Sequence, residues 1–357
     1  MQLGGAMKLR VATRKSALAL AQTTMAADAI VAANSASSAE SLTYELVSMT
    51  TEGDRRLDKS LASFGGKGVF IKELEIALLE NRADIAIHSL KDMPAEVLPQ
   101  FKLAAVLKRE DPRDAFLSRG GAAGVRFMDL PAGARVGTGS IRRIVQLKAL
   151  RPDIEYVPIR GNIQTRISKL AELDGVVLAA AGLKRMGLAD QVTEYFSTEQ
   201  VLPASGQGIL AIETLSENAD VDSRHPEQRE GSSQISAIAK ILDRANDVET
   251  FCIASAEMAF LKALNAGCQF PVASFAEFVE DSCASGVRDS SACDDALCSL
   301  GCENTKTLKI RGIYWDEKSE KLLRAECVGT VEINSPDCVQ QSKKLGVALA
   351  QEIKNQL

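Results

Sequence analysis

Cys268 is the residue whose chemistry stands out first, because it lies in a short turn-like segment, 265–272. Before it, residues 255–264 carry apolar side chains at helical spacing, and Gly267 lies where a helix stop is expected. Residues 270–278 have the pattern of a strand. A thiolate on such a turn is a strong nucleophile that could hold a group covalently. The alternative is a small buried hydrophobic residue.

Asp92 is the second candidate, because it follows residues 84–90, a run that is apolar on both faces and typical of a central parallel strand. Ligands bind outside the carboxyl ends of strands in open α/β sheets, so Asp92 and its neighbour Lys91 should meet a substrate. A carboxylate there could stabilise positive charge or relay a proton. The alternative is a loop cap before Pro94.

Basic residues follow several strand-like runs, each at or near the start of a helix-like run. A cation in the first turn of a helix is unfavourable by up to ~1 kcal/mol unless an anion is present. The arginine fork grips carboxylates with two hydrogen bonds, so the set predicts a ligand with several carboxylates. For any single member, the alternative is a solvated charge. The set comprises Arg14, Lys15, Arg142, Arg143, Arg160, Arg166 and Arg185.

The composition excludes several classes of protein. A net charge of -5 over 357 residues argues against general affinity for nucleic acid. No run approaches the ~18 to 20 apolar residues of a membrane span, and the N-terminus lacks the pattern of a signal peptide. Of the eight cysteines, four lie at 283–302 in a Ser/Asp-rich stretch without a CxxC pair. We expect a flexible insertion there and no metal; a metal site or an oxidisable cluster is the alternative.

The order of the expected elements predicts two α/β lobes and a smaller α+β domain. Residues 202–213 form a glycine-bent segment whose strand can return to the first lobe, which makes a hinged cleft. The glycine-rich run 64–70 lacks the spacing of a phosphate loop, so we expect a mobile loop over that cleft. Residues 216–233 should be an exposed excursion. The predicted division is 7–112 with 209–232, then 113–208, then 233–357 with an insertion at about 279–305.

Eight stretches together resemble the hydroxymethylbilane synthase (porphobilinogen deaminase) family. The resemblance reaches to about Glu277 and is weak beyond it, where the cysteine-rich insertion departs from the usual pattern. The stretches are 11–16, 65–68, 78–92, 109–116, 141–143, 160–162, 181–185 and 267–269.

This resemblance implies two periplasmic-binding-protein-like (type II) lobes with crossing hinge segments plus a C-terminal domain. It implies an enzyme that joins four porphobilinogen molecules head to tail, loses ammonia each time and releases hydroxymethylbilane for haem or chlorophyll biosynthesis. Cys268 would carry a dipyrromethane cofactor through a thioether, as a primer that stays attached. Asp92, with Lys91, would assist loss of the amino group and stabilise the resulting azafulvene cation.

The resemblance also implies roles for the other site residues. The cofactor would be held by Asp92, Lys91, Ser89, Thr138, Ser140, Arg142, Arg143, Arg160, Gly161 and Arg185. The substrate would be held by Arg14, Ser16, Phe70, Arg160, Arg166 and Arg185. Gly139 departs from the serine common in the family, which removes a possible hydroxyl contact.

Two other classes of function stay open at this point. A hinged two-lobe binding protein for an anionic small molecule would need neither Asp92 nor a modified Cys268. A nucleic-acid binder would show affinity that falls steeply with salt. We expect a monomer that acts on porphobilinogen without a membrane or nucleic-acid partner, in the cytoplasm or, after loss of a transit peptide, in the plastid stroma.

Overall fold

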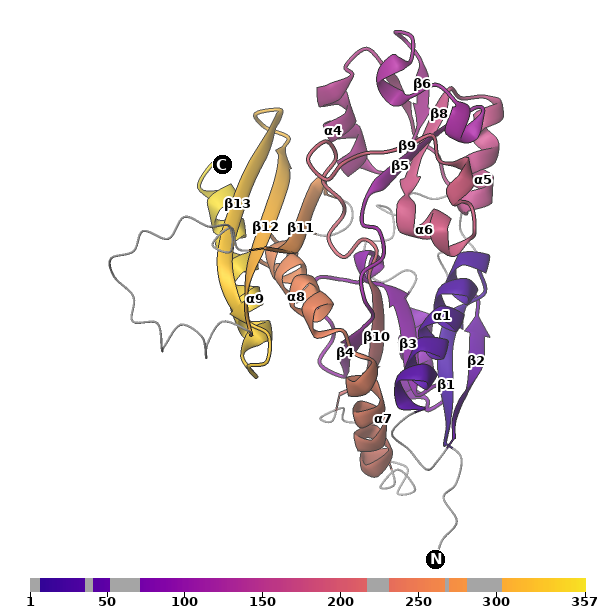
Figure 1. The fold of residues 1–357 in the computed structure, drawn as a ribbon, viewed down its shortest axis with the longest axis vertical. Coiled ribbons are helices and arrows are strands. Elements are labelled where there is room, and N and C mark those ends of the chain that lie inside the picture. Colours follow the sequence, from indigo (N-terminus) through magenta and orange to yellow (C-terminus); the bar gives the residue numbers. More distant parts are fainter. Residues whose placement is uncertain (1–6, 36–40, 52–70, 217–230, 267–269, 281–303) are drawn as a thin grey trace, which may run out of the picture.

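The computed structural model describes residues 7–35, 41–51, 71–216, 231–266, 270–280 and 304–357. Their strands form three separate sheets, and Figure 1 shows the second sheet above the first, with the third beside them. None of the described helices is long and apolar enough to cross a membrane.

The first sheet has the strand order β2-β1-β3-β10-β4. Strand β1 pairs in parallel with β2 and β3, whereas β10 is antiparallel to both β3 and β4. The predicted return of the late strand to the first lobe is therefore confirmed. Its elements are β1 (Met7–Arg14), α1 (Ala17–Asn34), β2 (Leu42–Met49), α3 (Lys72–Leu79), β3 (Ile85–Ser89), the 3-10 turn η2 (Leu90–Asp92), β4 (Phe101–Val106), β10 (Leu210–Leu215) and α7 (Gly231–Ala245).

Both faces of this sheet are buried, which explains its apolar central strands. Leu9 and Val11 of β1 face a core shared with α1 and α7, while Ala12 faces the core under α3. Ser16 caps α1 by accepting a hydrogen bond from Ala19 N at 3.3 Å. Helix α7 contributes Ile238 to the first core, although the predicted division places it in the third domain. The exact domain boundaries remain a prediction.

The second sheet repeats this plan with the order β7-β6-β8-β5-β9. Strand β6 is parallel to β7 and β8, and β5 is antiparallel to β8. Strand β7 ends directly before Pro158, which lacks the backbone N–H that would continue the ladder. The elements are β5 (Asp114–Ser118), η3 (Gly121–Ala123), η4 (Phe127–Asp129), β6 (Arg135–Gly137), α4 (Ile141–Leu150), β7 (Glu155–Val157), α5 (Ile163–Ser168), η5 (Lys169–Ala171), β8 (Gly175–Ala179), α6 (Ala180–Arg185), η6 (Ala189–Gln191) and β9 (Glu194–Tyr195).

Two crossing segments join these lobes and pair with each other. The first crossing, 107–113, leads from β4 to β5, and the second crossing, 196–209, leads from β9 to β10. Leu107 N donates to Leu210 O at 3.1 Å, and Glu110 N donates to Gly208 O at 3.2 Å. Each lobe thus receives an antiparallel strand from the other through a crossing. This exchange defines the type II two-lobed architecture and confirms the predicted fold class.

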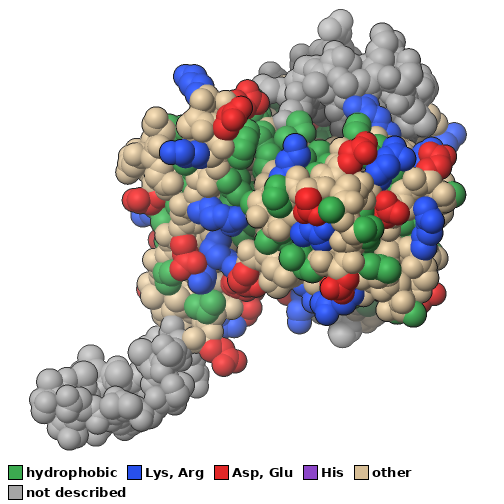
Figure 2. Space-filling view, turned by 90° about the horizontal axis from the view of Figure 1, so that it is seen from above, with side chains coloured by type: hydrophobic (Ala, Val, Ile, Leu, Met, Phe, Trp, Pro, Cys, Tyr) green, Lys and Arg blue, Asp and Glu red, His purple; other side chains and the backbone are tan. Residues whose placement is uncertain are grey.

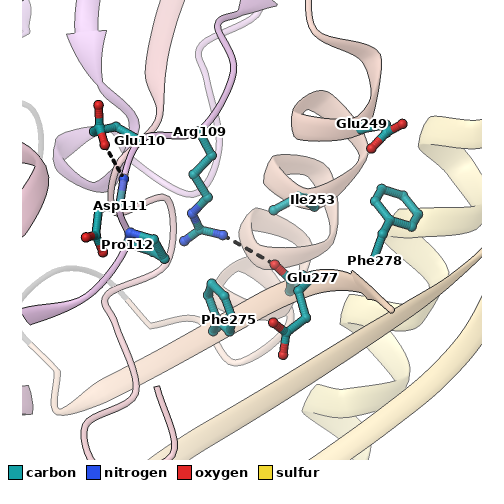
Figure 3. A pocket seen from close by; sticks show the side chains of 10 residues that line it. Arg109, Glu110, Asp111, Pro112, Glu249, Ile253, Phe275, Glu277 and Phe278 are labelled. Atoms are coloured by element: carbon teal, nitrogen blue, oxygen red, sulfur yellow. Dashed lines mark hydrogen bonds between the residues drawn. The ribbon is translucent and has the colours of Figure 1, made fainter. Parts of the chain in front are cut away.

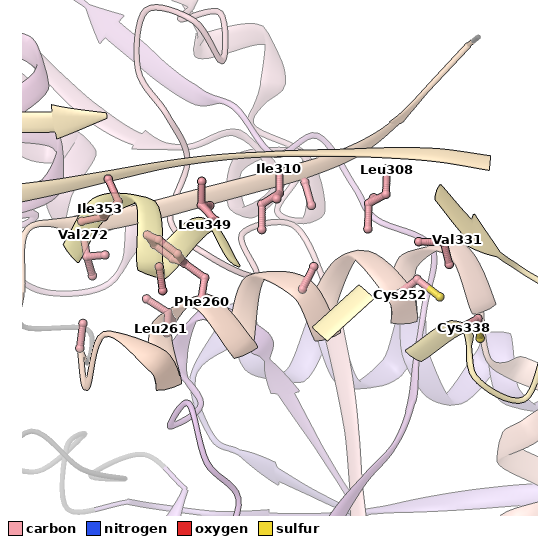
Figure 4. Packing of buried hydrophobic residues seen from close by; sticks show 14 residues of the cluster. Cys252, Phe260, Leu261, Val272, Leu308, Ile310, Val331, Cys338, Leu349 and Ile353 are labelled. Carbon is pink, nitrogen blue, oxygen red and sulfur yellow. The ribbon is translucent and has the colours of Figure 1, made fainter. Parts of the chain in front are cut away.

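The third sheet is an antiparallel meander covered on one face by two helices. Phe260, Leu308 and Ile310 lie at the centre of its core (Figure 4). Helices α8 and α9 approach closely at Gly346, where a Cβ atom would lie 2.0 Å from Ala256 O. Its elements are α8 (Val248–Ala263), β11 (Val272–Val279), β12 (Thr305–Asp316), β13 (Lys321–Glu332) and α9 (Cys338–Lys354).

A buried ion pair ties this third domain to both crossings. Arg109 of the first crossing donates to Glu257 Oε1 of α8 at 2.7 Å, and the two side chains are 8% and 0% exposed. Glu257 also accepts from Gly206 N of the second crossing at 2.5 Å and from Ala276 N of β11 at 2.8 Å. Figure 3 shows Arg109 reaching toward β11 beside a cavity of about 380 Å³. The crossings and the third domain therefore share one buried carboxylate.

Candidate functional site

The candidate site lies where the carboxyl ends of strands from both lobes approach the crossings. Arg14 ends β1, and Lys91 and Asp92 follow β3. Leu18 of α1 in the first lobe lies beside Gly182 of α6 in the facing lobe, so the two lobes are in contact. Parallel strands with their carboxyl ends at one edge are the usual source of ligand-binding groups in such sheets.

Asp92 and Lys91 lie on η2, the short turn that ends β3. The Asp92 side chain is exposed, so it is accessible to a ligand. Lys91 is partly buried and its Nζ donates to Gln207 Oε1 at 3.3 Å. Burial lowers the pKa of Lys91 to about 8, although the nearby Asp92 carboxylate opposes this shift. An amine with this pKa is able to hold or release a proton near neutral pH.

Arg142 and Arg143 are buried in the first turn of α4, and both pair with Asp114. Arg142 Nη1 donates to Asp114 Oδ2 at 2.7 Å, and Arg143 Nη2 donates to Asp114 Oδ1 at 2.7 Å. Burial alone would raise the pKa of Asp114, but the two guanidinium groups outweigh it and lower this pKa. We expected an anion beside these two arginines at the start of the helix, and that anion is the Asp114 carboxylate of the chain itself. The argument that these two arginines require a ligand anion was wrong, and their contact with a ligand stays a prediction.

Arg166 and Arg185 differ from that pair, because neither forms an ion pair within the described parts of the chain. Arg166 Nε donates to Gly161 O at 2.8 Å, and Arg185 Nη2 donates to Gly208 O at 2.6 Å. Burial lowers the pKa of Arg166 and lowers that of Arg185 to about 10. Two desolvated cations whose partners in the described parts of the chain are carbonyl groups favour binding of an added anion.

Electrostatic interactions show that the groups from the two lobes face one another. The pKa of Arg166 is lowered by burial and by Arg143 and Arg160, and it is raised by Asp92 from the first lobe. Lys91 of the first lobe likewise interacts with Asp114 and with Arg142 and Arg143 of the second. Asp92 and Lys91 therefore lie close to Arg142, Arg143 and Arg166 of the second lobe, and we call the space between these groups the cleft.

The smaller predicted residues mainly shape the backbone around this cleft. Ser89 Oγ donates to Gln22 Oε1 at 3.3 Å, and the buried Thr138 accepts from Ser140 N at 3.4 Å. The Ser140 side chain makes no capping bond to α4. Gly161 has φ +102°, a conformation that favours glycine.

Gly139 is explained by a close approach of two loops. A Cβ atom at this position would lie 2.6 Å from Ile159 O. The position therefore has no room for the family's serine unless the loop that follows β7 moves.

Several predicted residues lie outside the described residues. These are Cys268, the glycine-rich run 64–70 with its Phe70, and the four cysteines at 283–302. Ala266 and Phe270, which flank the segment around Cys268, are described: Ala266 is buried and Phe270 is 50% exposed.

Three buried residues near the cleft were missed by the sequence analysis. Asp114 was placed only in the first segment of a new unit, Gln207 only in a glycine bend, and Glu257 only in an amphipathic helix. A signal existed for Asp114, because it is a lone charge directly before the apolar residues 115–117 of its strand. Gln207 and Glu257 have no local sequence signal, since their side-chain partners lie from 19 to 148 residues away along the chain.

The fold is that of a two-lobed α/β protein of type II architecture with a third domain. A family model described as "Porphobilinogen deaminase, dipyromethane cofactor binding domain" matches residues 9–223. A second, "Porphobilinogen deaminase, C-terminal domain", matches residues 251–355. The chain belongs to the porphobilinogen deaminase family.

Curated relatives agree with these matches over nearly the whole chain. "Porphobilinogen deaminase" of Syntrophus aciditrophicus is 40% identical over 97% of this chain and 94% of its own. The enzyme of that name from Sorangium cellulosum is 40% identical over 97% of this chain and 98% of its own. The one from Clostridium acetobutylicum is 46% identical over 76% of this chain and 85% of its own.

Among solved structures, the methionine binding protein MetQ is similar at 12% identity, with a TM-score of 0.35 over 67% of this chain and 96% of its own. A likeness at that level carries no functional argument.

Proposed function

We propose that this chain is a hydroxymethylbilane synthase, a transferase that joins four porphobilinogen molecules head to tail with release of ammonia. Its family membership carries the assignment. The single structural observation that supports it best is the cluster of buried cations facing Asp92 across the cleft. Porphobilinogen carries two carboxylates, so a growing chain needs many guanidinium groups.

The residues present fit the dipyrromethane cofactor of the family. Its acid side chains need cations, and Arg166 and Arg185 offer desolvated guanidinium groups that donate to carbonyl groups among the described residues. Its pyrrole N–H groups need an acceptor, and Asp92 is an exposed carboxylate at the end of β3. When bound, the dipyrromethane supplies the primer to which each new unit is joined. Attachment through Cys268 is part of this proposal.

Asp92 and Lys91 have the properties that loss of an amino group requires. An ionised Asp92 stabilises positive charge that develops beside it, and its exposure lets it contact each incoming unit. Lys91, with a pKa of about 8, holds a proton at neutral pH and releases it at modest cost. Arg14, Ser16 and Arg160 are proposed to hold substrate carboxylates at the mouth of the cleft.

Intact mass tests the covalent part of the proposal. The purified protein should exceed its sequence mass by one dipyrromethane unit, and Cys268→Ser should have the sequence mass and no turnover. Cys327→Ser is a matched control, because that thiol lies on β13 in the third domain. A wild-type protein with no added mass after incubation with porphobilinogen would refute the enzyme assignment and favour an anion-binding protein.

Asp92→Asn tests the catalytic part. It removes the charge while keeping the shape of the side chain, so we expect the cofactor mass to stay and turnover to fall more than about tenfold, or about 1.4 kcal/mol. A smaller loss would make Asp92 a structural cap of η2.

The surface and the relatives bear on partners and compartment. Exposed Lys and Arg side chains are interspersed with Asp and Glu on the face seen in Figure 2, which supports a small-molecule substrate over nucleic acid. The relatives compared above are bacterial, which favours a cytoplasmic enzyme over a plastid one. We propose that it acts as a monomer.

A further inference from the structure

Gln207 lies in the second crossing, where the backbone is held in one unusual conformation. Its neighbours Gly206 and Gly208 have φ values of +74° and +91°. A Cβ atom at Gly206 would lie 2.8 Å from Leu90 Cγ, and one at Gly208 would lie 2.4 Å from Glu110 O. The segment is therefore wedged between η2 of the first lobe and the first crossing, which fixes the direction of the Gln207 side chain.

The Gln207 carboxamide bridges both lobes and the first crossing. Its Oε1 accepts from Lys91 Nζ of the first lobe at 3.3 Å. Its Nε2 donates to Pro112 O at 2.7 Å and to Asp114 Oδ1 of the second lobe at 2.9 Å. The side chain is 1% exposed, so these bonds form away from bulk water, where an unmade bond is costly.

The same carboxamide therefore contacts the two groups that set the charge of the cleft. Asp114 is the carboxylate that pairs with Arg142 and Arg143. Lys91 is the amine beside Asp92. An amide suits this place because it accepts from the ammonium with one end and donates to the carboxylate with the other. Neither a carboxylate nor an apolar side chain satisfies both.

We propose that Gln207 is a positioning residue that fixes the Lys91 ammonium relative to the Asp114–Arg142–Arg143 cluster, and so couples the charge of Lys91 to the relative position of the two lobes. If the lobes hinge to accommodate a longer product, a change in the distance between Lys91 and Asp114 strains the two hydrogen bonds that Gln207 makes to them. The expected effect on turnover rests on the proposed function, whereas the effect of Gln207 on the charge of Lys91 does not depend on it.

The charged groups around Lys91 give the sign of each expected effect. Asp92 comes from η2, Arg142 and Arg143 come from α4, and Asp114 comes from β5. Loss of the Oε1 acceptor removes a bond to the charged amine, so Gln207→Met should lower the pKa of Lys91. Gln207→Glu places a negative charge beside the amine and should raise it.

Gln146 offers a matched control. It is also a glutamine 1% exposed beside the second crossing, where its Nε2 donates to Leu202 O at 3.0 Å and its Oε1 accepts from Leu202 N at 2.7 Å. Among the described residues, Gln146 bonds to backbone groups of Leu202 and Arg142 and not to Lys91. Gln146→Met therefore removes equally buried bonds without touching the amine.

The test measures Lys91 directly and turnover separately. Competitive acetylation with acetic anhydride from pH 6 to 10, read by peptide mass spectrometry, gives the pKa of Lys91 without any need for activity. We expect Gln207→Met to shift it down, and Gln207→Glu to shift it up, by at least about half a unit, with Gln146→Met at the wild-type value. In the turnover assay, kcat of Gln207→Met should fall about tenfold or more, with KM changed less than about threefold.

Opposite outcomes overturn the proposal. A Lys91 pKa unmoved in both Gln207 variants, or moved equally by Gln146→Met, would show that Gln207 only packs the hinge. If Gln207→Met does not fold, the Gln207→Glu shift decides alone. Absence of turnover in the wild-type protein would instead refute the proposed function. The acetylation experiment would still test the role of Gln207, because it does not require activity.

Discussion

Glu257→Gln should lower the free energy of unfolding by about 3 to 5 kcal/mol, although glutamine has nearly the shape of glutamate. The carboxylate is fully buried and accepts only from N–H groups. On Oε1 these are Arg109 Nη1 and Ala276 N, and on Oε2 they are Gly206 N and, at 3.5 Å, Arg109 Nη2. An amide NH2 accepts from none of them, so each orientation of glutamine leaves two donors without an acceptor.

The larger part of the loss comes from charge. The Arg109 side chain is 8% exposed, so in the variant its guanidinium would remain buried without a counter-charge. Breaking a buried pair by removing one partner typically costs more than the pair itself contributes. The Arg109 cation also lies 4.7 Å from the centre of the Phe275 ring, which offsets only part of this cost.

Urea unfolding followed by Trp315 fluorescence measures this effect. Trp315 is the single tryptophan and lies at the end of β12, in the sheet that packs on α8. With a slope of about 3 kcal/mol per M, the midpoint should fall by at least about 1 M.

The control is Glu249→Gln on the same helix, where the carboxylate pairs with Lys306 but is 46% exposed. We expect less than about 1 kcal/mol there. If Glu257→Gln is no more destabilising than this control, the buried carboxylate is not what joins the third domain to the crossings.

Three further predictions concern pH, backbone conformation and thiol reactivity. Burial would raise the pKa of Asp111, but Arg113 and Lys184 lower it to about 2. The ionised carboxylate therefore contributes about 2 kcal/mol to the free energy of unfolding above pH ~4, and this contribution is lost as the pH falls toward 2. Between pH 5 and 2 the free energy of unfolding of Asp111→Asn should fall less than that of the wild type, and an equal fall in both proteins would contradict this. Gly208→Ala should destabilise the protein by about 2 kcal/mol more than Gly133→Ala. Both glycines have positive φ, but a Cβ atom would clash with Glu110 O only at Gly208. Equal unfolding midpoints of the two variants would show that the crossing moves to make room for the added methyl group. Burial raises the pKa of Cys252 to about 12, so iodoacetamide at pH 8 should label it only in urea, as peptide mapping would show, and rapid native labelling would refute its burial.

The sequence was sufficient for most of the fold because local patterns and turn chemistry agree there. Three features depend only on residues that are close together in the sequence. They are the apolar run that forms β3, the Ser16 cap of α1 and the meander of the third domain. The return of β10 was predictable from its position after a complete second unit. The pairing of the two crossings was not, since it joins Glu110 to Gly208 across almost a hundred residues.

The site was predictable in its residue types but not in its internal pairing. A basic first turn on α4 does call for an anion, and sequence reasoning assigned that anion to a ligand. The structure places Asp114 there instead, because β5 lies next to β8 in the sheet and points its first residue at α4. Whether the carboxylate comes from the protein or from a ligand depends on tertiary contacts, which the spacing of residues along the chain does not reveal.

Strand β10 sits between β3 and β4, although it follows the entire second lobe along the chain. After β4 has been synthesised, the ribosome must add about 100 more residues before β10 is complete. At about 5 to 20 residues per second this takes roughly 5 to 20 s, during which the first sheet lacks one of its strands. Strands β3 and β4 meanwhile present open edges that invite pairing with other nascent chains. The second lobe has no such wait, because β5 to β9 emerge consecutively. It is therefore expected to fold first and deliver β10, so a chain released before that strand is made should aggregate and not yield a half-sized protein.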